Sequence, residues 1–327
     1  MNILLIRMDL LGDGIVSGTF IDSLKTSIPS SRIDVLCNTS NVSAFTFHPN
    51  INNVYKLNHQ QKTKQLASDL DDVVSRINST VSYDLVIVLN GCVRSYRYAM
   101  RINAKKIIAR NLFTKSIRSK CLMLIMKYWK NVSFFVEPFG VHEVVRLNKY
   151  CQFVLDYLKI SANAHLPQRA NFYPDVNFSR DSITPKSIAI NISGKKDESR
   201  YINDNLLYAL VNELTKLNFF VSVVFLNEDS ERIRMVQNSL QIQLNLINDS
   251  NIFNVAKQLA NHEYYIGVDG GLAHVAAGVG MKCIILFDNQ DINLWHPWTD
   301  CQISLRSERK NIYDLSYSDI IGAISGI

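Results

Sequence analysis

An aspartate flanked by two glycines stands shortly after the first apolar run of the chain. The stretch LLIRMDLLGDGIVSG (4–18) places Asp13 between Gly12 and Gly14. A carboxylate at the carboxyl edge of a sheet could take a proton from an alcohol, which is general-base chemistry. Aspartate is also a favoured N-cap residue, so Asp13 could instead begin a helix. The stretch alone leaves both interpretations open.

The glycines of this stretch are also close to a dinucleotide-binding fingerprint. Their G-x-G-x-x-x-G spacing is one residue too long for the G-x-G-x-x-G pattern. The fingerprint further requires an acidic residue at the end of the second strand, where it holds a ribose. Asn38 stands there instead. An NAD-dependent oxidoreductase is therefore the less favoured alternative.

A second group of residues with chemical potential lies near the other end of the chain. Within YYIGVDGGLAHVAAGVGMKCIILFD (264–288), Asp269, Gly270 and Gly271 separate an apolar run from a helical pattern that contains His274. Paired glycines at a helix start allow a phosphate to approach free backbone N–H groups, where the helix dipole also favours negative charge. His274 could donate to a phosphate oxygen, or it could simply be a packed histidine beside a capping Asp269.

The length, charge and cysteine content of the chain limit the classes of protein to which it can belong. The 327 residues suit two domains, and a formal net charge of +6 suits an anionic ligand but not a nucleic-acid-binding protein. No run of 18 apolar residues is free of charge, so we expect no membrane-spanning helix, and we interpret the N-terminal apolar run as a buried strand and not as a signal peptide. The six scattered cysteines indicate reduced thiols of a cytoplasmic protein, and no histidine pair has metal-site spacing, so we expect no metal.

Alternating apolar runs and helical patterns must position these residues. In the first half we predict strands over 2–7, 33–38, 83–90 and 104–110, and helices over 15–27, 62–77, 91–102 and 142–160. After a linker over 161–186, we predict strands over 187–193, 219–227, 244–247, 263–269 and 282–288, and helices over 203–217, 230–240, 251–261 and 270–280. This alternation predicts an α/β protein with two parallel-sheet domains, 1–165 and 166–327, which face each other across a central cleft. The last helix is expected to pack back on the N-terminal domain.

The segment TKSIRSKCLMLIMKYWK (114–130) combines basic residues with a Leu/Met/Ile run. It could rest on an anionic membrane surface or meet an anionic lipid. We favour a core helix whose basic ends, including Lys120, remain useful for an acidic acceptor.

The two end motifs together resemble glycosyltransferase family 9, the bacterial lipopolysaccharide heptosyltransferases. The family pattern R-x-D-x-x-G-D is matched by Arg7, Asp9, Gly12 and Asp13, and its D-[TSG]-G-x-x-H motif is matched by Asp269, Gly270, Gly271 and His274. Weaker similarities cover 47–58, 85–100, 140–148 and 193–207, with Asn90 in place of a usual aspartate. The resemblance covers nearly the whole chain.

This resemblance implies a GT-B fold of two Rossmann-like domains, with the acceptor on the N-terminal side and a nucleotide-sugar donor on the C-terminal side. It implies inverting, metal-independent transfer without a cofactor, with Asp13 as the catalytic base. The donor diphosphate is expected to meet Arg200, Lys195, Lys196, Asp269, Gly270, Gly271, Leu272 and His274, while Glu228 accepts from the ribose. Acceptor binding is expected from Gly12, Gly14, Arg94 and Lys120.

The chain also departs from the family pattern. Ser199 replaces the lysine before Arg200, Tyr201-Ile202 replaces a W-P pair, and DNQD (288–291) replaces G-P-T. Two alternatives to ADP-heptose transfer therefore stay open. The protein could use a different nucleotide-sugar as donor, or it could be a non-catalytic member that binds a nucleotide or glycan. The expected acceptor is an anionic glycolipid or glycan, the expected location is the cytoplasm with peripheral contact to the inner membrane, and no nucleic acid is expected.

Overall fold

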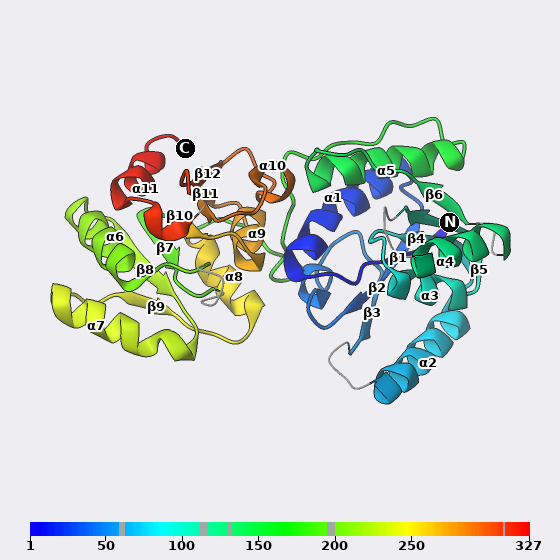
Figure 1. Cartoon of the computed structure of the whole chain (residues 1–327), viewed down its shortest axis with the longest axis horizontal. Helices are drawn as coiled ribbons and strands as arrows, with labels where there is room; N and C mark the ends of the chain where they lie inside the picture. Colours follow the sequence, from blue (N-terminus) through cyan, green and yellow to red (C-terminus); the bar gives the residue numbers. More distant parts are fainter. Residues whose placement is uncertain (59–62, 112–116, 130–131, 195–199, 310) are drawn as a thin grey trace. The chain divides into compact units, whose positions relative to one another are not determined.

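The computed structural model describes residues 1–58, 63–111, 117–129, 132–194, 200–309 and 311–327. The chain divides into two compact units, Met1–Pro167 and Gln168–Ile327. Within the described residues, each unit holds a six-stranded sheet whose neighbouring strands are all parallel (Figure 1). The predicted α/β class with parallel sheets is confirmed.

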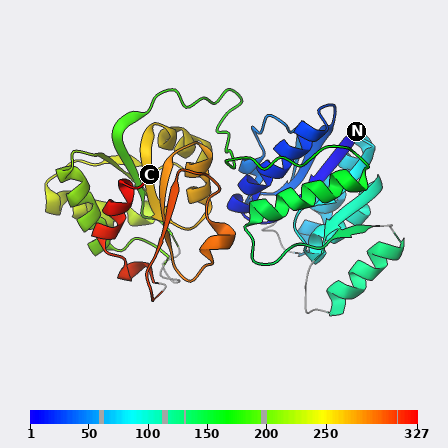
Figure 2. The same ribbon diagram turned by 90° about the horizontal axis from the view of Figure 1, so that it is seen from above.

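The first unit is built on a sheet with the strand order β3-β2-β1-β4-β5-β6. Its elements are β1 (Asn2–Ile6), α1 (Leu11–Ser27), β2 (Arg32–Asn38), η1 (Val42–Ala44), β3 (Asn53–Leu57), α2 (Thr63–Thr80), β4 (Tyr83–Val88), α3 (Val93–Arg101), β5 (Ala104–Arg110), α4 (Ile117–Trp129), β6 (Ser133–Phe135) and α5 (Glu143–Tyr157). The central strands β1 and β4 are mostly apolar because helices cover both faces of the sheet. Helices α1 and α5 lie side by side on one face, where Phe20 and Tyr150 are in contact, while α2 and α3 cover the other (Figure 2).

The second unit repeats this plan with the strand order β12-β11-β10-β7-β8-β9. Its elements are β7 (Thr184–Asn191), α6 (Asp204–Lys216), β8 (Phe220–Val224), η3 (Asn227–Asp229), α7 (Ser230–Leu240), β9 (Asn245–Ile247), α8 (Ile252–Ala260), β10 (His262–Val268), α9 (Gly271–Gly278), β11 (Lys282–Phe287), α10 (Ile292–Trp295), β12 (Gln302–Arg306), η4 (Ile312–Asp314) and α11 (Tyr317–Ile324). Helices α6, α7 and α11 share one core cluster with the sheet, and α8 and α9 pack on β10.

One prediction about helices in the fold is wrong, and one stays a prediction. The final helix, α11, buries Ile320 and Ile324 in the core of the second unit together with α6, and its expected contact with the N-terminal domain stays a prediction. Helix α4 is not a core helix: Met126 is buried, but Leu124, Ile125 and Tyr128 are 55, 48 and 76% exposed. Across the described part of the chain, every helix is too short or too polar to span a bilayer.

The start of α1 also differs from its prediction, which began the helix at residue 15. The helix begins at Leu11, so Gly12, Asp13 and Gly14 lie in its first turn and not in a preceding loop. Gly14 is needed for close packing: a Cβ added there would lie 2.8 Å from the Cβ of Ala44 in η1 and 3.2 Å from the Cβ of Asn41. These neighbours are held by the backbone, so they cannot rotate away.

We therefore expect Gly14→Ala to destabilise the protein. Alanine would favour the helix by up to about 1 kcal/mol. Overpacking against a rigid neighbour costs about 1–3 kcal/mol, so the clash prevails. Urea unfolding would measure the change, with Gly322→Ala as the control, because a Cβ at Gly322 of α11 meets nothing within 4 Å. A Gly14→Ala variant as stable as the control variant would contradict this account.

Candidate functional site

In each unit, the polar motifs lie where the strand order reverses. The chain runs outward from β1 to β3, returns to β4 beside β1, and continues outward on the other side. Loops after β1 and β4 therefore diverge, and such a switch point is where open α/β sheets bind ligands. In the second unit, β7 and β10 have the same relation. The motif around Asp13 follows β1, and the motif around Asp269 follows β10.

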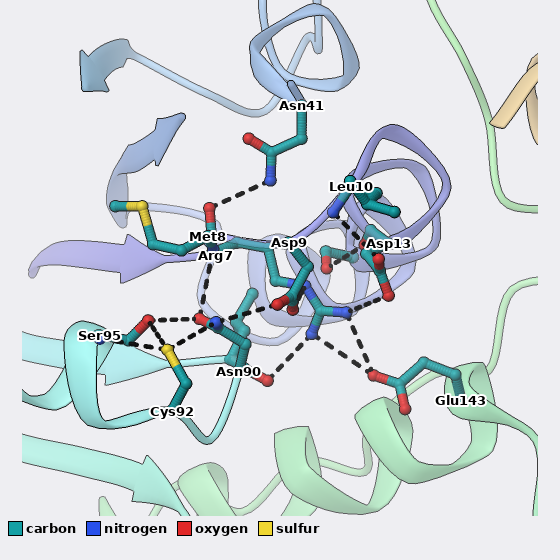
Figure 3. Close-up of polar contacts among 12 residues, drawn as sticks. Arg7, Met8, Asp9, Leu10, Asp13, Asn41, Asn90, Cys92, Ser95 and Glu143 are labelled. Atoms are coloured by element: carbon teal, nitrogen blue, oxygen red, sulfur yellow. Dashed lines mark hydrogen bonds and ion pairs between the residues drawn. The ribbon is translucent and has the colours of Figure 1, made fainter. Parts of the chain in front are cut away.

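Arg7 is the centre of the first switch point (Figure 3). It directly follows β1, and only 2% of its surface is exposed. Its guanidinium donates to Oδ1 of Asp13 at 3.1 Å and to the carbonyl of Leu89, after β4, at 3.0 Å. It also lies 3.1 Å from Oδ2 of Asp9 and 3.4 Å from Oε1 of Glu143. One buried cation thus joins carboxylates from three segments of the chain.

Asp13 has both of its carboxylate oxygens engaged. Oδ1 accepts from Arg7, and Oδ2 accepts from the backbone N–H of Leu10 at 3.1 Å. Leu10 is the N-cap of α1, so Asp13 does not cap the helix from the first position, as its alternative interpretation held. It satisfies the N-cap N–H from the third helical position, as the acidic residue of a capping box does. The side chain remains 19% exposed.

Asp9 shares Arg7 with Asp13 and is held by Asn90. Nδ2 of Asn90 donates to Oδ1 of Asp9 at 3.2 Å, while Oδ1 of Asn90 accepts from the N–H of Met8 and from the hydroxyl of Ser95. Burial raises the pKa of Asp9, against the opposing effect of the Arg7 guanidinium. An aspartate at position 90 would repel the Asp9 carboxylate, whereas the amide of Asn90 donates a hydrogen bond to it. Electrostatics therefore explains why asparagine suits this position.

Asn38, which replaces the ribose-binding acid of the dinucleotide fingerprint, has a different role in the structure. Its side-chain amide donates to the carbonyls of Met8 and Asp9 at 2.8 and 3.1 Å. The residue is buried and fixes the loop between β1 and α1. This loop carries Asp9, so Asn38 supports the site through the backbone.

Glu143 and Arg110 complete the charge cluster from α5 and β5. Arg110 donates to both oxygens of Glu143, at 2.6 and 3.0 Å, and Arg146 lies 3.3 Å away. Burial opposes ionisation of Glu143, but the hydrogen bonds and charge of Arg110 hold its pKa below the ordinary value. Burial would likewise lower the pKa of Arg110, but Glu143 and Glu137 raise it. Glu143 and Arg110 are not among the residues predicted from the sequence. The signals that could have indicated them are a charged residue at the end of a buried strand, for Arg110, and an acidic residue at a helix start, for Glu143.

The predicted acceptor residues occupy different environments. Gly12 is partly buried in the first turn of α1, and Gly14 is buried against η1. Arg94 is exposed in the first turn of α3, directly after β4, and so lies at the same sheet edge as Asp13. Lys120 is part of α4. Their binding roles stay predictions.

The second switch point brings together Arg200, Asp269 and Asp288. Arg200 donates to the carboxylate of Asp269 at 2.8 Å and to its backbone carbonyl at 3.1 Å, and lies 3.4 Å from Oδ2 of Asp288. Burial raises the pKa of Asp269 to about 6, with Asp288 acting in the same direction and Arg200 against it. Asp288 directly follows β11 and is not among the predicted site residues. Its signal was again a polar residue at the end of a buried strand.

The first turn of α9 provides the predicted phosphate-binding backbone. Gly270 is its N-cap, and Gly271 and Leu272 begin the helix, where N–H groups have no partner within the helix. A Cβ at Gly270 would meet nothing within 4 Å. His274 is 7% exposed, and its Nδ1 has no hydrogen-bond partner among the described residues. Burial lowers the pKa of His274 to about 4, so the imidazole is neutral at pH 7.

Of the remaining predicted donor residues, the structure describes Glu228, which is exposed in η3, after β8. Its neighbour Asp229 is fully buried and accepts from the hydroxyl of Ser193, which follows β7, at 3.0 Å. Lys195 and Lys196 lie outside the described residues. Among the described residues, no group of three histidine, cysteine, aspartate or glutamate side chains could hold a metal ion.

Asp269 and His274 should affect stability with opposite pH dependence. The raised pKa of Asp269 means that the folded state gains stability as pH falls from about 6 toward 3.8. The lowered pKa of His274 means that stability is lost as pH falls from 6.5 toward about 4. Each linkage amounts to about 3 kcal/mol, so the two nearly cancel in the wild-type protein.

Single substitutions should separate the two linkages. We compare the change in the free energy of unfolding from pH 7 to pH 4 in each variant with the same change in wild type. We expect this change to be about 3 kcal/mol less favourable in Asp269→Asn and about 3 kcal/mol more favourable in His274→Gln. Urea unfolding at the two pH values measures both. Parallel pH dependence of the two variants would show that these side chains do not titrate as described.

Comparison with known proteins agrees with this architecture. The sequence model of glycosyltransferase family 9 (heptosyltransferase) matches residues 78–324. Lipopolysaccharide heptosyltransferase 3 of Escherichia coli is 21% identical over 304 residues, which cover 89% of this chain and 85% of that protein. The structure of E. coli heptosyltransferase WaaC with ADP matches with a TM-score of 0.81 and 14% identity, over 100% of this chain and 99% of the other.

A further solved structure, the family 9 glycosyltransferase of Veillonella parvula, matches with a TM-score of 0.79 and 17% identity, over 99% of this chain and 96% of the other. At these identities the solved structures establish the fold, which is the GT-B fold of the heptosyltransferases. The family match covers more than half of the chain and includes the motif around Asp269. The chain therefore belongs to glycosyltransferase family 9 and is a glycosyltransferase.

Proposed function

We propose that this glycosyltransferase transfers a heptose from ADP-heptose to a lipopolysaccharide core or a related bacterial surface glycan. The transfer is a direct, inverting displacement that needs no metal. The observation that carries the proposal is the Asp13 carboxylate: it is fixed by two hydrogen bonds at a sheet switch point and remains partly exposed.

In the proposed reaction, Asp13 takes the proton of an acceptor hydroxyl while the hydroxyl oxygen attacks the anomeric carbon. The bond between that carbon and the diphosphate breaks, and ADP leaves with the bonding electrons. Attack from the face opposite the leaving group inverts the anomeric configuration. A positioned general base contributes about 10²–10⁴-fold to such a step.

The second unit supplies groups for the leaving diphosphate. The N-terminal turn of α9, the guanidinium of Arg200 and the buried imidazole of His274 are all able to donate hydrogen bonds to anionic oxygens. Nδ1 of the neutral His274 imidazole has no partner among the residues that the structure describes, so this side chain is well suited to a ligand oxygen, because one of its two ring nitrogens carries a proton. Lys195 and Lys196 would add positive charge for the leaving diphosphate, and Glu228 would accept hydrogen bonds from the ribose hydroxyls.

The acceptor side of the proposal involves the first unit. Arg94 lies at the sheet edge that carries Asp13, and α4 exposes Leu124, Ile125 and Tyr128 together with Lys127. An apolar and basic surface of this kind fits an anionic glycolipid at a membrane surface. We propose that α4, including Lys120, contacts the acceptor or the cytoplasmic face of the inner membrane, and that the protein acts in the cytoplasm.

A nucleotide titration tests the donor assignment. Thermal unfolding is followed with ADP, UDP, GDP, dTDP, CMP and NAD, since a ligand that binds only the folded state stabilises it by mass action. We expect ADP to give the largest shift and expect His274→Ala and Arg200→Ala to weaken it. A shift with NAD alone, or with no nucleotide, would contradict a nucleotide-sugar site, and preference for another diphosphate would change the donor.

Transfer itself is measured with ADP-heptose and a heptose-deficient lipopolysaccharide acceptor in buffer that contains EDTA. We expect release of ADP together with a glycosylated product of inverted anomeric configuration. Retained configuration, or activity that is lost with EDTA and restored by a divalent cation, would contradict the proposed mechanism.

A further inference from the structure

We propose that Arg7 is a positioning residue for the base, which orients the Asp13 carboxylate for proton transfer and is itself held by Glu143. This inference rests on the proposed function of Asp13. It assigns a role to a buried side chain that does not itself meet the substrate.

The fork of the Arg7 guanidinium explains how one residue can orient Asp13. Its nitrogens contact Asp9 after β1, Asp13 on α1, and Glu143 on α5, and one of them also donates to the Leu89 carbonyl after β4 (Figure 3). A guanidinium has a rigid planar arrangement of donors, so these contacts determine its position from several directions. With 2% exposure, Arg7 has little freedom to follow a moving carboxylate.

Asp13 is in turn left with one orientation. Its Oδ1 is held by Arg7 and its Oδ2 by the N–H of Leu10, both at 3.1 Å. Each carboxylate oxygen has a second lone pair, so an incoming hydroxyl can still donate to it. A reacting group that is already oriented needs no further ordering at the transition state.

The charges around Arg7 favour this role over simple ion pairing. Glu143 is bound on both oxygens by Arg110, so much of its charge is already balanced. Asp9 and Asp13, 35 and 19% exposed, then share the single charge of Arg7. Two carboxylates against one cation leave excess negative charge on the accessible side, where a proton must be accepted.

The test is a double-mutant cycle on the chemical step. Single-turnover transfer from ADP-heptose is measured in wild type, Arg7→Lys, Asp13→Asn and the double variant, together with the Kd for ADP. Lysine retains the charge but cannot bridge the carboxylates. We expect Arg7→Lys to slow transfer about 100-fold, as a misplaced reacting group does, with the Kd for ADP changed less than about twofold. In the Asp13→Asn background, we expect Arg7→Lys to have less than about a threefold further effect.

A purely structural arginine would give a different pattern. An effect of Arg7→Lys that is as large in the Asp13→Asn background as in the wild-type background would overturn the inference, and so would a rate for Arg7→Lys close to that of wild type. The matched control is Arg32→Lys, which alters an arginine paired with Asp34 in the same unit and should leave the rate unchanged. If Arg7→Lys does not fold, Glu143→Gln enters the same cycle, because it keeps the length of the side chain that holds Arg7.

Failure of the proposed function would be recognisable separately. Wild-type protein that binds ADP but does not turn over ADP-heptose would contradict the donor or reaction assignment. Crystal structures of wild type and Arg7→Lys would then judge the positioning role directly. An Asp13 carboxylate that keeps both its orientation and its contact with Leu10 in the variant would overturn it.

Discussion

Replacing Asp13 with asparagine is expected to slow sugar transfer by about 10²–10⁴-fold while ADP binding is retained, because the general base is lost. The fold should tolerate the change. Asparagine keeps an oxygen that can accept from the N–H of Leu10, and Arg7 still has Asp9 and Glu143 as counter-charges. Single-turnover rates and ADP titrations separate the chemical step from donor binding.

Asp22→Asn is the matched control for this substitution. Asp22 lies on the same helix, α1, with a side chain 22% exposed, and accepts from the amide of Asn50 at 2.8 Å. The same chemical change there should leave the transfer rate close to that of wild type. Transfer by Asp13→Asn at a near wild-type rate would exclude Asp13 as the base and direct attention to Asp9, which shares the Arg7 guanidinium.

The second large effect is expected from Glu143→Ala, which should lower the free energy of unfolding by about 3–5 kcal/mol. Glu143 is 1% exposed and lies among Arg7, Arg110 and Arg146. Removing it leaves three cations close together in a largely buried site. For a unit of this size, the loss corresponds to a decrease in Tm of about 10 °C.

The control for Glu143→Ala is Asp71→Ala in the same unit. Asp71 pairs with Arg101 on the surface, where the side chains are 61 and 43% exposed. Exposed pairs contribute about 0–1 kcal/mol, so this variant should unfold nearly as the wild type does. Equal stability of the two variants would mean that the buried cluster contributes no more than a surface pair.

Local sequence pattern was sufficient for most of the strands and helices that position the two sites. Continuous apolar runs predicted β1, β2, β4 and β5 because a parallel strand covered on both faces contains few polar residues. The short strands β3, β6 and β12 were not predicted. They hold three to five residues at or near the sheet edges, so their apolar signal is weak.

The start of α1 shows where local pattern failed. Glycines normally indicate a turn, and the prediction placed Gly12 and Gly14 before the helix. The structure places them inside it, and the glycine at position 14 is explained by tertiary packing against Ala44 and Asn41, which leaves no room for a Cβ. The exposed face of α4 has a related origin: its apolar residues suit a core, but the fold provides burial only for residues such as Met126.

The sequence by itself determined which polar residues follow the buried strands, and so pointed to Asp13, Asp269 and their motifs as candidates. Side-chain type and spacing are local properties, and parallel strands carry such residues to one edge of a sheet. Only the tertiary structure decided that Arg7 would meet Glu143, 136 positions away, and that Arg200 would lie between Asp269 and Asp288. The partner of a buried charge is set by how the elements pack together. Because the two residues can be far apart in the sequence, a local sequence pattern does not predict the pair.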